Sequence, residues 1–419
     1  MKKKEIFLVA ALVVFGVIYQ AVEKGKVRFA ENFSSFTAER RLKGSRFAEF
    51  PGKEMPFPGV NRVVIENPAG EVTVERSADG QVHLSSLLRV YYSDRSVVDE
   101  LHKKTEVRSD LDNGALTVSV RYPSAFPYRH LRVLFRLQVP EGVPLSIANH
   151  EGDVVVRDTG ADMRIAQENG GLVLENIPGR TQLHLKNCVA KIKGLAAHAE
   201  ITASHANVRL EEAVSLRLNG RHGEFSIKNV KEAVNVEFAY GSLRIDGAGS
   251  LEIAARHSDV RALNIRAGAI IANRYENIFL ENAGGDIRLS NRSGRIDMVR
   301  STAGNVVIEN SYADVTLADF SAASLDVLLK NGDLGLGATS ITDRINIEAQ
   351  HAQLALTFAA LADPTFSIKT RHGRIYAQPF PGLESYEENE ESFANRSGQK
   401  PEILIHNSYG DVRVKIANR

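Results

Sequence analysis

The sequence has 419 residues, which is enough for two or three ordinary domains or for one long array of repeats. Its 52 lysines and arginines balance 51 aspartates and glutamates, so no overall electric field favours a nucleic acid partner. Cys188 is the only cysteine, which excludes an intrachain disulfide and a cluster of thiolate metal ligands.

The chain begins with three consecutive lysines, Lys2 to Lys4, which are followed by an apolar segment. Residues 6–22 are apolar except for Gln20, and this length is at the short end of what crosses a bilayer as one helix. A cleaved signal peptide is the alternative, but cleavage after Ala21 would place Tyr19 where a small residue is preferred. We therefore predict an uncleaved signal anchor in residues 1–26 that forms one transmembrane helix. We expect the bacterial inner (cell) membrane, with the C-terminal part in the periplasm or outside the cell.

The next segment, residues 27–60, contains "ERRLKGSR" and "FPGKEMPFPG" and is predicted to be a linker. Residues 61–145 then mix apolar alternation, as in "VVIENPAGEVTVER", with a helical pattern over residues 93–107. Strands are predicted at residues 115–120 and 131–139. We interpret residues 61–145 as a β-rich N-terminal cap with a short helix, because the first coil of a repeat array otherwise exposes an open strand edge.

From residue 146 to residue 419 one short sequence motif recurs, as in "NHEGDVVVR", "FAYGSLRID" and "HNSYGDVRVKI". The apolar residues that open these strands, here called anchors, are separated by steps of 17 to 21 residues and by one final step of 37. A fixed period of about 20 residues is typical of a solenoid. The anchors are Val154, Leu172, Ala190, Val208, Phe225, Leu243, Val260, Ile278, Ile296, Val315, Leu334, Leu354, Ile375 and Val412.

The columns beside the anchors support this register. The residue two positions after each anchor is apolar, as a strand with one buried face requires. The residue two positions before it is usually small, which suits a tight corner. A second alternating run, such as "LRL" or "VNV", follows about nine residues later. The sequence thus predicts an all-β β-solenoid (β-helix) with coils of about 18 residues. The acidic segment 379–400 is predicted to be an inserted loop between two coils.

The column three residues before each anchor contains several histidines. It reads Glu151, Asn169, Asn187, His205, His222, Tyr240, His257, Tyr275, Ser293, Tyr312, Asn331, His351, His372 and Tyr409. Two histidines one coil apart, such as His205 with His222 or His351 with His372, would share a metal ion if their nitrogens converged. Tyrosines and asparagines interrupt the histidines, however, and no regular third ligand occurs. We therefore predict a corner ladder of stacked side chains, with no metal and no other cofactor.

Other charged patterns do not predict catalysis. Six aspartates lie at turns just before strands, where they suit turn formation better than acid–base chemistry: Asp153, Asp259, Asp286, Asp314, Asp333 and Asp411. The double-glycine and aspartate pattern of a calcium β-roll occurs once, at residues 284–286, so no calcium site is expected. A basic stripe, formed by Lys191, Arg209, Arg244 and Arg261, is interpreted as a solvated edge. No catalytic residue is predicted.

The phrase "SYGDVRV", with "IENPAGEVTV" upstream, resembles the bacterial putative-adhesin family of β-solenoid domains over roughly residues 60–419. The resemblance implies a surface or periplasmic solenoid, often membrane-anchored, without an established enzymatic activity and without catalytic residues to carry over. The predicted function is a non-enzymatic adhesin or cell-envelope binding or structural rod, with a protein or glycan partner and no nucleic acid. The alternatives are a polymerising scaffold similar to bactofilin filaments and a carbohydrate-active β-helix enzyme.

Overall fold

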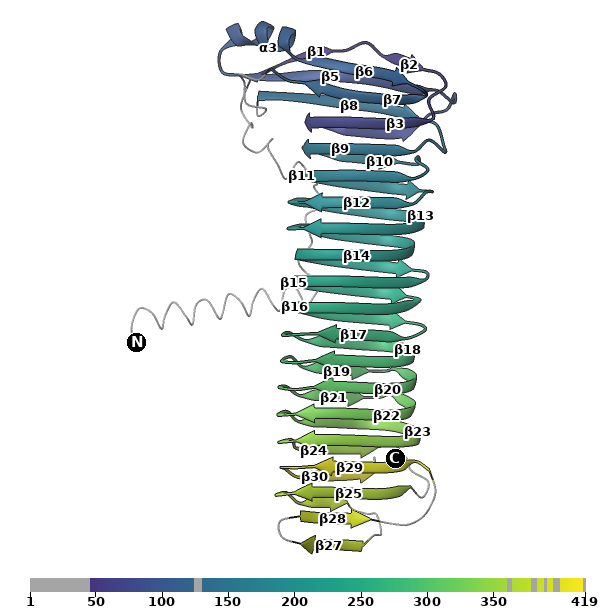
Figure 1. Ribbon diagram of the computed structural model, residues 1–419, viewed down its shortest axis with the longest axis vertical. Coiled ribbons are helices and arrows are strands. Elements are labelled where there is room, and N and C mark those ends of the chain that lie inside the picture. The colour runs from purple at the N-terminus through teal and green to yellow at the C-terminus, as the bar shows by residue number, and fades with distance from the viewer. Residues whose placement is uncertain are drawn as a thin grey trace, which may run out of the picture.

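The computed structural model describes residues 46–123, 130–359, 364–377, 383–387, 390–394 and 400–416. Most of these residues belong to strands that stack into one elongated rod (Figure 1). The predicted all-β solenoid is confirmed. The predicted signal anchor, residues 1–26, lies outside the described residues. Among the residues that are described, no helix has the length and apolar character needed to cross a membrane.

The N-terminal end of the rod is a wider layer of mostly antiparallel strands (Figure 1). In it, β5 pairs antiparallel with β8, and β6 pairs antiparallel with β7. The predicted helix over residues 93–107 is present as η1 and α3, and the Asp94 side chain accepts a hydrogen bond from the Ser96 backbone N–H. The elements are β1 (Arg46–Pro51), β2 (Met55–Phe57), β3 (Arg62–Ala69), β4 (Val72–Arg76), β5 (Val82–Tyr92), η1 (Arg95–Val97), α3 (Val98–Lys104), β6 (Glu106–Asp112), β7 (Ala115–Arg121) and β8 (Leu131–Val139).

The predicted linker, residues 27–60, needs a correction in its second half. Strands β1 and β2 both pair antiparallel with β5, so residues 46–57 form part of the sheet. The side chains of Phe50 and Phe57 pack against the hydrophobic core. Short runs between prolines and glycines carry too little alternation to predict a strand, and here the strand exists because the edge of β5 offers hydrogen-bonding groups to pair with.

Beyond this layer, parallel strands repeat along the rod in the predicted register. Val154 lies beside Leu172, Leu172 beside Ala190, and Ala190 beside Val208. The strands are β9 (Leu145–Glu151), β10 (Val154–Arg157), β11 (Met163–Ile177), β12 (Thr181–Lys186), β13 (Cys188–Ser204), β14 (Asn207–Val230), β15 (Ala233–Ala248), β16 (Ser250–Ile265), β17 (Ala269–Asn273), β18 (Ile278–Asn291), β19 (Ile296–Val299), β20 (Thr302–Asn310), β21 (Val315–Ala318), β22 (Ser321–Lys330), β23 (Leu334–Gln350) and β24 (Leu354–Phe358).

Each coil contributes one strand segment to each of two layers that enclose the core. We call the layer that contains the anchors the anchor layer, and the layer that contains the second alternating runs the second layer. Val208 and Leu210 point inward from the anchor layer, and Leu216 and Leu218 point inward from the second layer; all four are at most 3% exposed. The buried side chains form one hydrophobic cluster along the rod, as the period-2 alternation requires.

The small residues two positions before the anchors are explained by close contact between coils. A Cβ atom built on Gly170 would lie 1.9 Å from the carbonyl oxygen of Gly152 in the preceding coil. Gly170 also has a φ of 149°, which side-chain-bearing residues rarely adopt. The corner therefore has no room for a larger side chain at this position, as predicted from the small residues found there.

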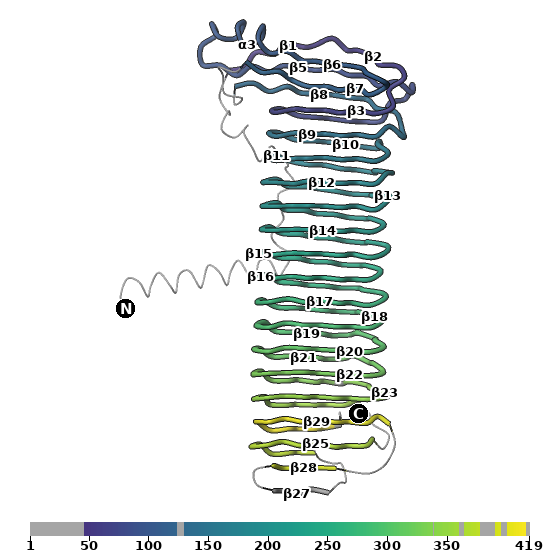
Figure 2. The backbone as a smooth tube through the Cα atoms, in the orientation of Figure 1, coloured from purple at the N-terminus to yellow at the C-terminus, as the bar shows by residue number. Residues whose placement is uncertain are grey.

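The C-terminal coils do not follow chain order, which corrects the sequence-based prediction. We expected residues 402–416 to form the last coil, after residues 365–377. Instead β29 lies between β23 and β25, and β30 lies between β24 and β26 (Figure 2). The strands concerned are β25 (Thr365–Arg371), β26 (Ile375–Ala377), β27 (Leu383–Glu387), β28 (Glu390–Ala394), β29 (Glu402–Asn407) and β30 (Val412–Ile416).

The predicted inserted loop, residues 379–400, also differs from expectation. Its described parts, β27 and β28, pair with each other as an antiparallel hairpin. Strand β28 then pairs antiparallel with β25 at the far end of the rod (Figure 1). The segment therefore does not leave the stack between two coils, as predicted, but extends the second layer beyond its last parallel strand.

Candidate functional site

The predicted corner ladder is present and consists of stacked rings. His205 and His222 stack with their ring centroids 4.7 Å apart and their planes 19° from parallel. The stack continues from His222 to Tyr240, His257 and Tyr275, with centroid separations between 4.5 and 5.0 Å. These separations match the spacing of neighbouring strands. The ladder thus follows from placing one ring at the same corner of successive coils.

The backbone at this corner explains which residue types occur there. His205, His222, Tyr240, His257 and Tyr275 all have φ between 52° and 66°. This left-handed region is uncommon for residues other than glycine, and asparagine and histidine are enriched in it. Tyrosine has no such preference, so stacking against its neighbours is the interaction that stabilises it at the corner.

A second stack corrects the expected neighbours of two histidines. His351 and His372 were predicted to lie one coil apart, but Tyr409 lies between them. Its ring stacks on His351 at 4.5 Å and on His372 at 4.9 Å. The reason is the insertion of the last coil of the chain, which brings Tyr409 between the other two corners.

The geometry of the ladder is unsuitable for a metal site. The lone pairs of imidazole nitrogens lie in the ring plane, so the nearly parallel rings of His205 and His222 direct them side by side and not toward one point. Over the described parts of the chain, no group of three or more histidine, cysteine, aspartate or glutamate residues is arranged to hold a metal ion.

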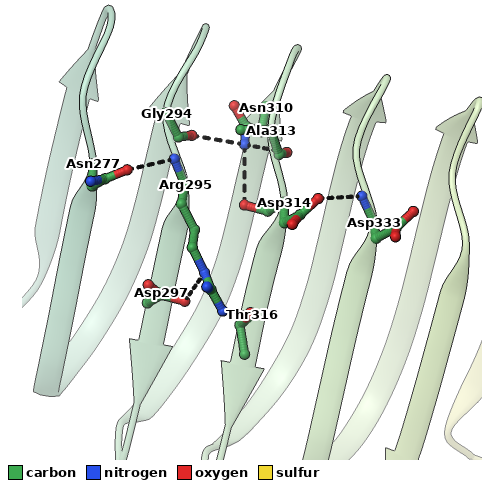
Figure 3. A network of polar contacts seen from close by, with 9 residues as sticks. All are labelled: Asn277, Gly294, Arg295, Asp297, Asn310, Ala313, Asp314, Thr316 and Asp333. Carbon is green, nitrogen blue, oxygen red and sulfur yellow. Dashed lines mark hydrogen bonds and ion pairs between the residues drawn. The ribbon is translucent and has the colours of Figure 1, made fainter. Parts of the chain in front are cut away.

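The aspartates at the turns bind the backbone of the next coil. Asp153 Oδ1 accepts a hydrogen bond from the Gly171 N–H at 2.6 Å, and Asp314 Oδ1 accepts one from the Asp333 N–H at 3.0 Å (Figure 3). Asp286 Oδ1 accepts one from the Asn305 N–H at the opposite corner. These bonds link the turns of neighbouring coils, and the carboxylates are spread along the rod, at most one to a coil, rather than paired for acid–base chemistry.

Sequence analysis missed a column of buried asparagines five residues before the anchors. Asn310 is 2% exposed, and its Nδ2 donates to the carbonyl oxygens of Gly294 and Ala313 (Figure 3). Its Oδ1 accepts from the Ser311 N–H. Asn291 and Asn273 make similar contacts one and two coils earlier, respectively. The asparagine that opens "NHEGDV" and "NSYADV" was the available signal, because a buried amide at a turn satisfies backbone groups that water cannot reach.

A groove of about 970 Å³ lies on the outer face of the second layer. Its floor contains Ala254, Ala272 and Ser290, which occupy the same outward position in successive coils. The exposed side chains of Arg256, Arg274 and Arg292, each two residues after a floor residue, form one wall. The ends of the floor row are occupied by glutamates, one coil before Ala254 (Glu237) and one coil after Ser290 (Glu309).

The basic stripe singled out from the sequence lies on the outer face of the anchor layer. Lys191 is beside Arg209, and Arg244 is beside Arg261. The two pairs are separated by Ser226, which lies beside Arg244. The guanidinium of Arg261 lies over the ring of Phe279, 4.5 Å from its centroid. The stripe is therefore interrupted.

Part of the chain is similar to a known protein family. Residues 248–415 match the family model described as Toastrack DUF4097. This part of the chain is similar to Toastrack domains. The resemblance to bacterial adhesin-type β-solenoids that the motifs indicated is thereby confirmed. The matched segment includes most of the residues of the arginine-walled groove and the inserted last coil up to residue 415.

Solved structures with similarity to the chain include three bacterial proteins. A putative cell adhesion protein from Clostridium sporogenes is 10% identical, with 89% of this chain and 100% of that chain covered and a TM-score of 0.18. A putative adhesin from Parabacteroides merdae is 11% identical, with coverages of 74% and 96% and a TM-score of 0.22. A putative lipid binding protein from Parabacteroides distasonis is 10% identical, with coverages of 70% and 96% and a TM-score of 0.21. No curated protein matches the chain.

Proposed function

We propose that this protein is a non-enzymatic binding rod, anchored in the bacterial cell membrane by residues 1–26, that presents its Toastrack-like domain to a partner in the cell envelope. The observation that carries the proposal is the groove on the outer face of the second layer, which lies on a stack of coils cross-linked by hydrogen bonds at its corners. A rigid surface of this kind binds a partner without losing much conformational freedom on binding.

The ends of the rod favour a single molecule over a filament. At one end the last strands are antiparallel, since β5 pairs with β8 and β6 pairs with β7. At the other end β28 pairs antiparallel with β25. A bactofilin-like scaffold would need parallel strand edges that are free to continue the stack. We infer that residues 46–139 and the β27–β28 hairpin act as caps, as a solenoid needs at its ends.

The turn carboxylates favour binding over catalysis. A carbohydrate-active β-helix enzyme needs an acid and a base that converge on one bond. In this chain the aspartates at the anchor corner each serve a neighbouring coil, as Asp333 does by accepting from the Gln353 N–H at 2.9 Å. We therefore propose that any envelope glycan is bound without being cleaved.

Membrane fractionation in a bacterial host tests the anchor. The full chain is expected in the membrane fraction, and a shortened chain that begins at Ser45 behind a cleavable export signal is expected as soluble protein. This shorter chain keeps β1 and β2, which pair with β5. Protease added to spheroplasts should degrade the full chain from outside. Recovery of a soluble, N-terminally trimmed full chain, or protection from external protease, would contradict the proposed anchor or its orientation.

A further inference from the structure

Three arginines in successive coils form the wall of the groove. Arg256, Arg274 and Arg292 occupy the same outward position of the second layer, so neighbouring side chains start roughly 4.8 Å apart. Within the described part of the chain, none of their guanidinium groups has a carboxylate partner. Like charges directly opposite on neighbouring strands destabilise a sheet. The row therefore weakens the unbound rod.

Several other arginines on the rod are paired with carboxylates. Arg157 donates to the carboxylate of Glu175 in the next coil at 2.7 Å. Arg371 occupies the position equivalent to Arg274 near the far end of the rod and lies 3.6 Å from the Glu390 carboxylate. The arginine row of the groove lacks such carboxylates, and a ligand with acidic groups at a similar spacing would supply them.

Two aromatic side chains lie near the arginines: Tyr312 lines the groove, and Tyr275 follows Arg274 directly in the chain. Tyr275 stacks on His257 through one face and is 38% exposed, and Tyr312 is 59% exposed. Ser293 occupies the corner position of the coil between them, so no ring fills that level of the ladder. Two strand spacings separate the two tyrosines by roughly 9.6 Å at the backbone. This gap is about the thickness of one sugar ring in contact with an aromatic ring on each side.

We infer that the groove binds a short stretch of a linear acidic glycan, and this inference rests on the proposed function as an envelope-binding rod. Carboxylates of the glycan pair with Arg256, Arg274 and Arg292, because the guanidinium group matches a carboxylate with two parallel hydrogen bonds. One sugar ring lies between Tyr275 and Tyr312, where the electron-rich ring faces attract its C–H groups. The small floor residues leave room for the chain of sugars.

The charges around the groove favour an acidic glycan over a nucleic acid. Glu237 and Glu309 close the two ends of the floor row, and Glu252 is exposed two residues before Ala254 on the same strand. These carboxylates would repel a polymer that carries a phosphate on every residue and continues past both ends. The near-neutral charge of the whole chain supplies no long-range attraction for such a polymer.

Calorimetric titration of the full chain in detergent micelles tests the inference. The probes are oligogalacturonate and oligomannuronate hexasaccharides, with maltohexaose as the neutral glycan and a short single-stranded DNA as the nucleic acid. We expect one or both acidic hexasaccharides to bind, maltohexaose and DNA to bind at least about tenfold more weakly, and affinity to fall between about 50 and 200 mM salt.

Two variants place the binding in the groove. Arg274→Gln removes the central guanidinium, and Ala272→Glu adds a carboxylate to the exposed floor; each is expected to weaken binding at least about tenfold. Arg244→Gln removes the same charge from the outer face of the anchor layer and should leave the affinity unchanged. Melting temperatures within about one degree of the parent chain would show that the exposed substitutions preserve the fold.

Several results would overturn the inference. They are failure of both acidic hexasaccharides to bind, equal affinity for maltohexaose, or acidic binding that Arg274→Gln leaves unchanged. Tighter binding of DNA that is lost in Arg274→Gln would assign the groove to nucleic acid instead. Membrane fractionation does not involve the groove, so failure here is distinguishable from failure of the proposed anchored rod.

Discussion

The carboxylate of Asp411 accepts a hydrogen bond from the backbone N–H of Arg374 at 3.1 Å, although Arg374 precedes it by 37 residues. On its other side, the Asp411 N–H donates to Gln353 Oε1 at 3.2 Å. This row of hydrogen bonds between coils thus runs from Asp333 through Gln353 and Asp411 to Arg374, out of chain order. The last coil therefore needs both of its neighbours, and the outer coil depends on the last coil for a parallel partner.

We expect a disturbed last coil to loosen the coil beyond it. Val414 is 1% exposed, and Val414→Asp would bury a carboxylate without a partner, at a cost on the order of 3 kcal/mol or more. Lys415→Asp, at the exposed neighbouring position, is the control. Hydrogen exchange should show faster exchange in residues 365–377 for Val414→Asp only. If residues 365–377 kept their protection in Val414→Asp, the outer coil would not depend on the last coil.

A second prediction concerns the close contact between coils at the corner formed by small residues two positions before the anchors. Gly170→Val would place its Cβ on the Gly152 carbonyl oxygen and require an unfavourable φ, so we expect a loss of about 3 kcal/mol or more in the free energy of unfolding. Gly335→Ala is the control, because no atom lies within 4 Å of its added Cβ. Chemical denaturation measures both. Equal midpoints for the two variants would contradict the close approach.

We expect the removal of a side-chain amide from the column of buried asparagines to lower the free energy of unfolding. Asn310→Ala would leave the carbonyl oxygen of Ala313 and the N–H of Ser311 without these partners, at a cost of about 1–3 kcal/mol. Asn235→Ala removes the same group from the exposed face of β15 and should change stability by less than about 0.5 kcal/mol. Thermal denaturation of both variants measures the two losses of stability. Equal losses for Asn310→Ala and Asn235→Ala would contradict the importance of the buried amide.

The stacked histidines predict no response to added zinc. Because the rings of His205 and His222 lie face to face, their nitrogens do not converge, and stoichiometric zinc should leave the melting temperature unchanged. The double change His205→Asn and His222→Asn should be mild, since Asn187 adopts the same left-handed backbone at φ 50°. A rise of several degrees with zinc that the double variant lacks would overturn the structural interpretation of the ladder.

Cys188 should resist thiol reagents while the rod is folded. Burial raises the pKa of its thiol to about 12, so almost no thiolate forms in the folded state at about pH 8. As the pH rises above the ordinary value of 9.0, the unfolded thiol ionises first, and the folded rod loses this contribution to stability. Iodoacetamide labelling followed by mass spectrometry should modify Cys188 only in denaturant. Rapid labelling of native protein would contradict its burial.

The sequence by itself determined the coil period, the inward columns and the small corner residues. Each of these depends on local alternation, which a core with one buried face imposes residue by residue, as at Val208 and Leu210. It also indicated the ring ladder from His205 to Tyr275, because equal steps along the chain place equal positions at one corner.

Tertiary structure alone decided the order of the C-terminal coils, the pairing of residues 46–57 and the groove. Every coil presents similar parallel edges, so β29 can pair with β23 as well as β25 can, and chain order does not choose between them. The groove likewise depends on side chains from separate coils, in which small floor residues meet three arginines. No single repeat contains that combination, and only stacking the coils brings it together.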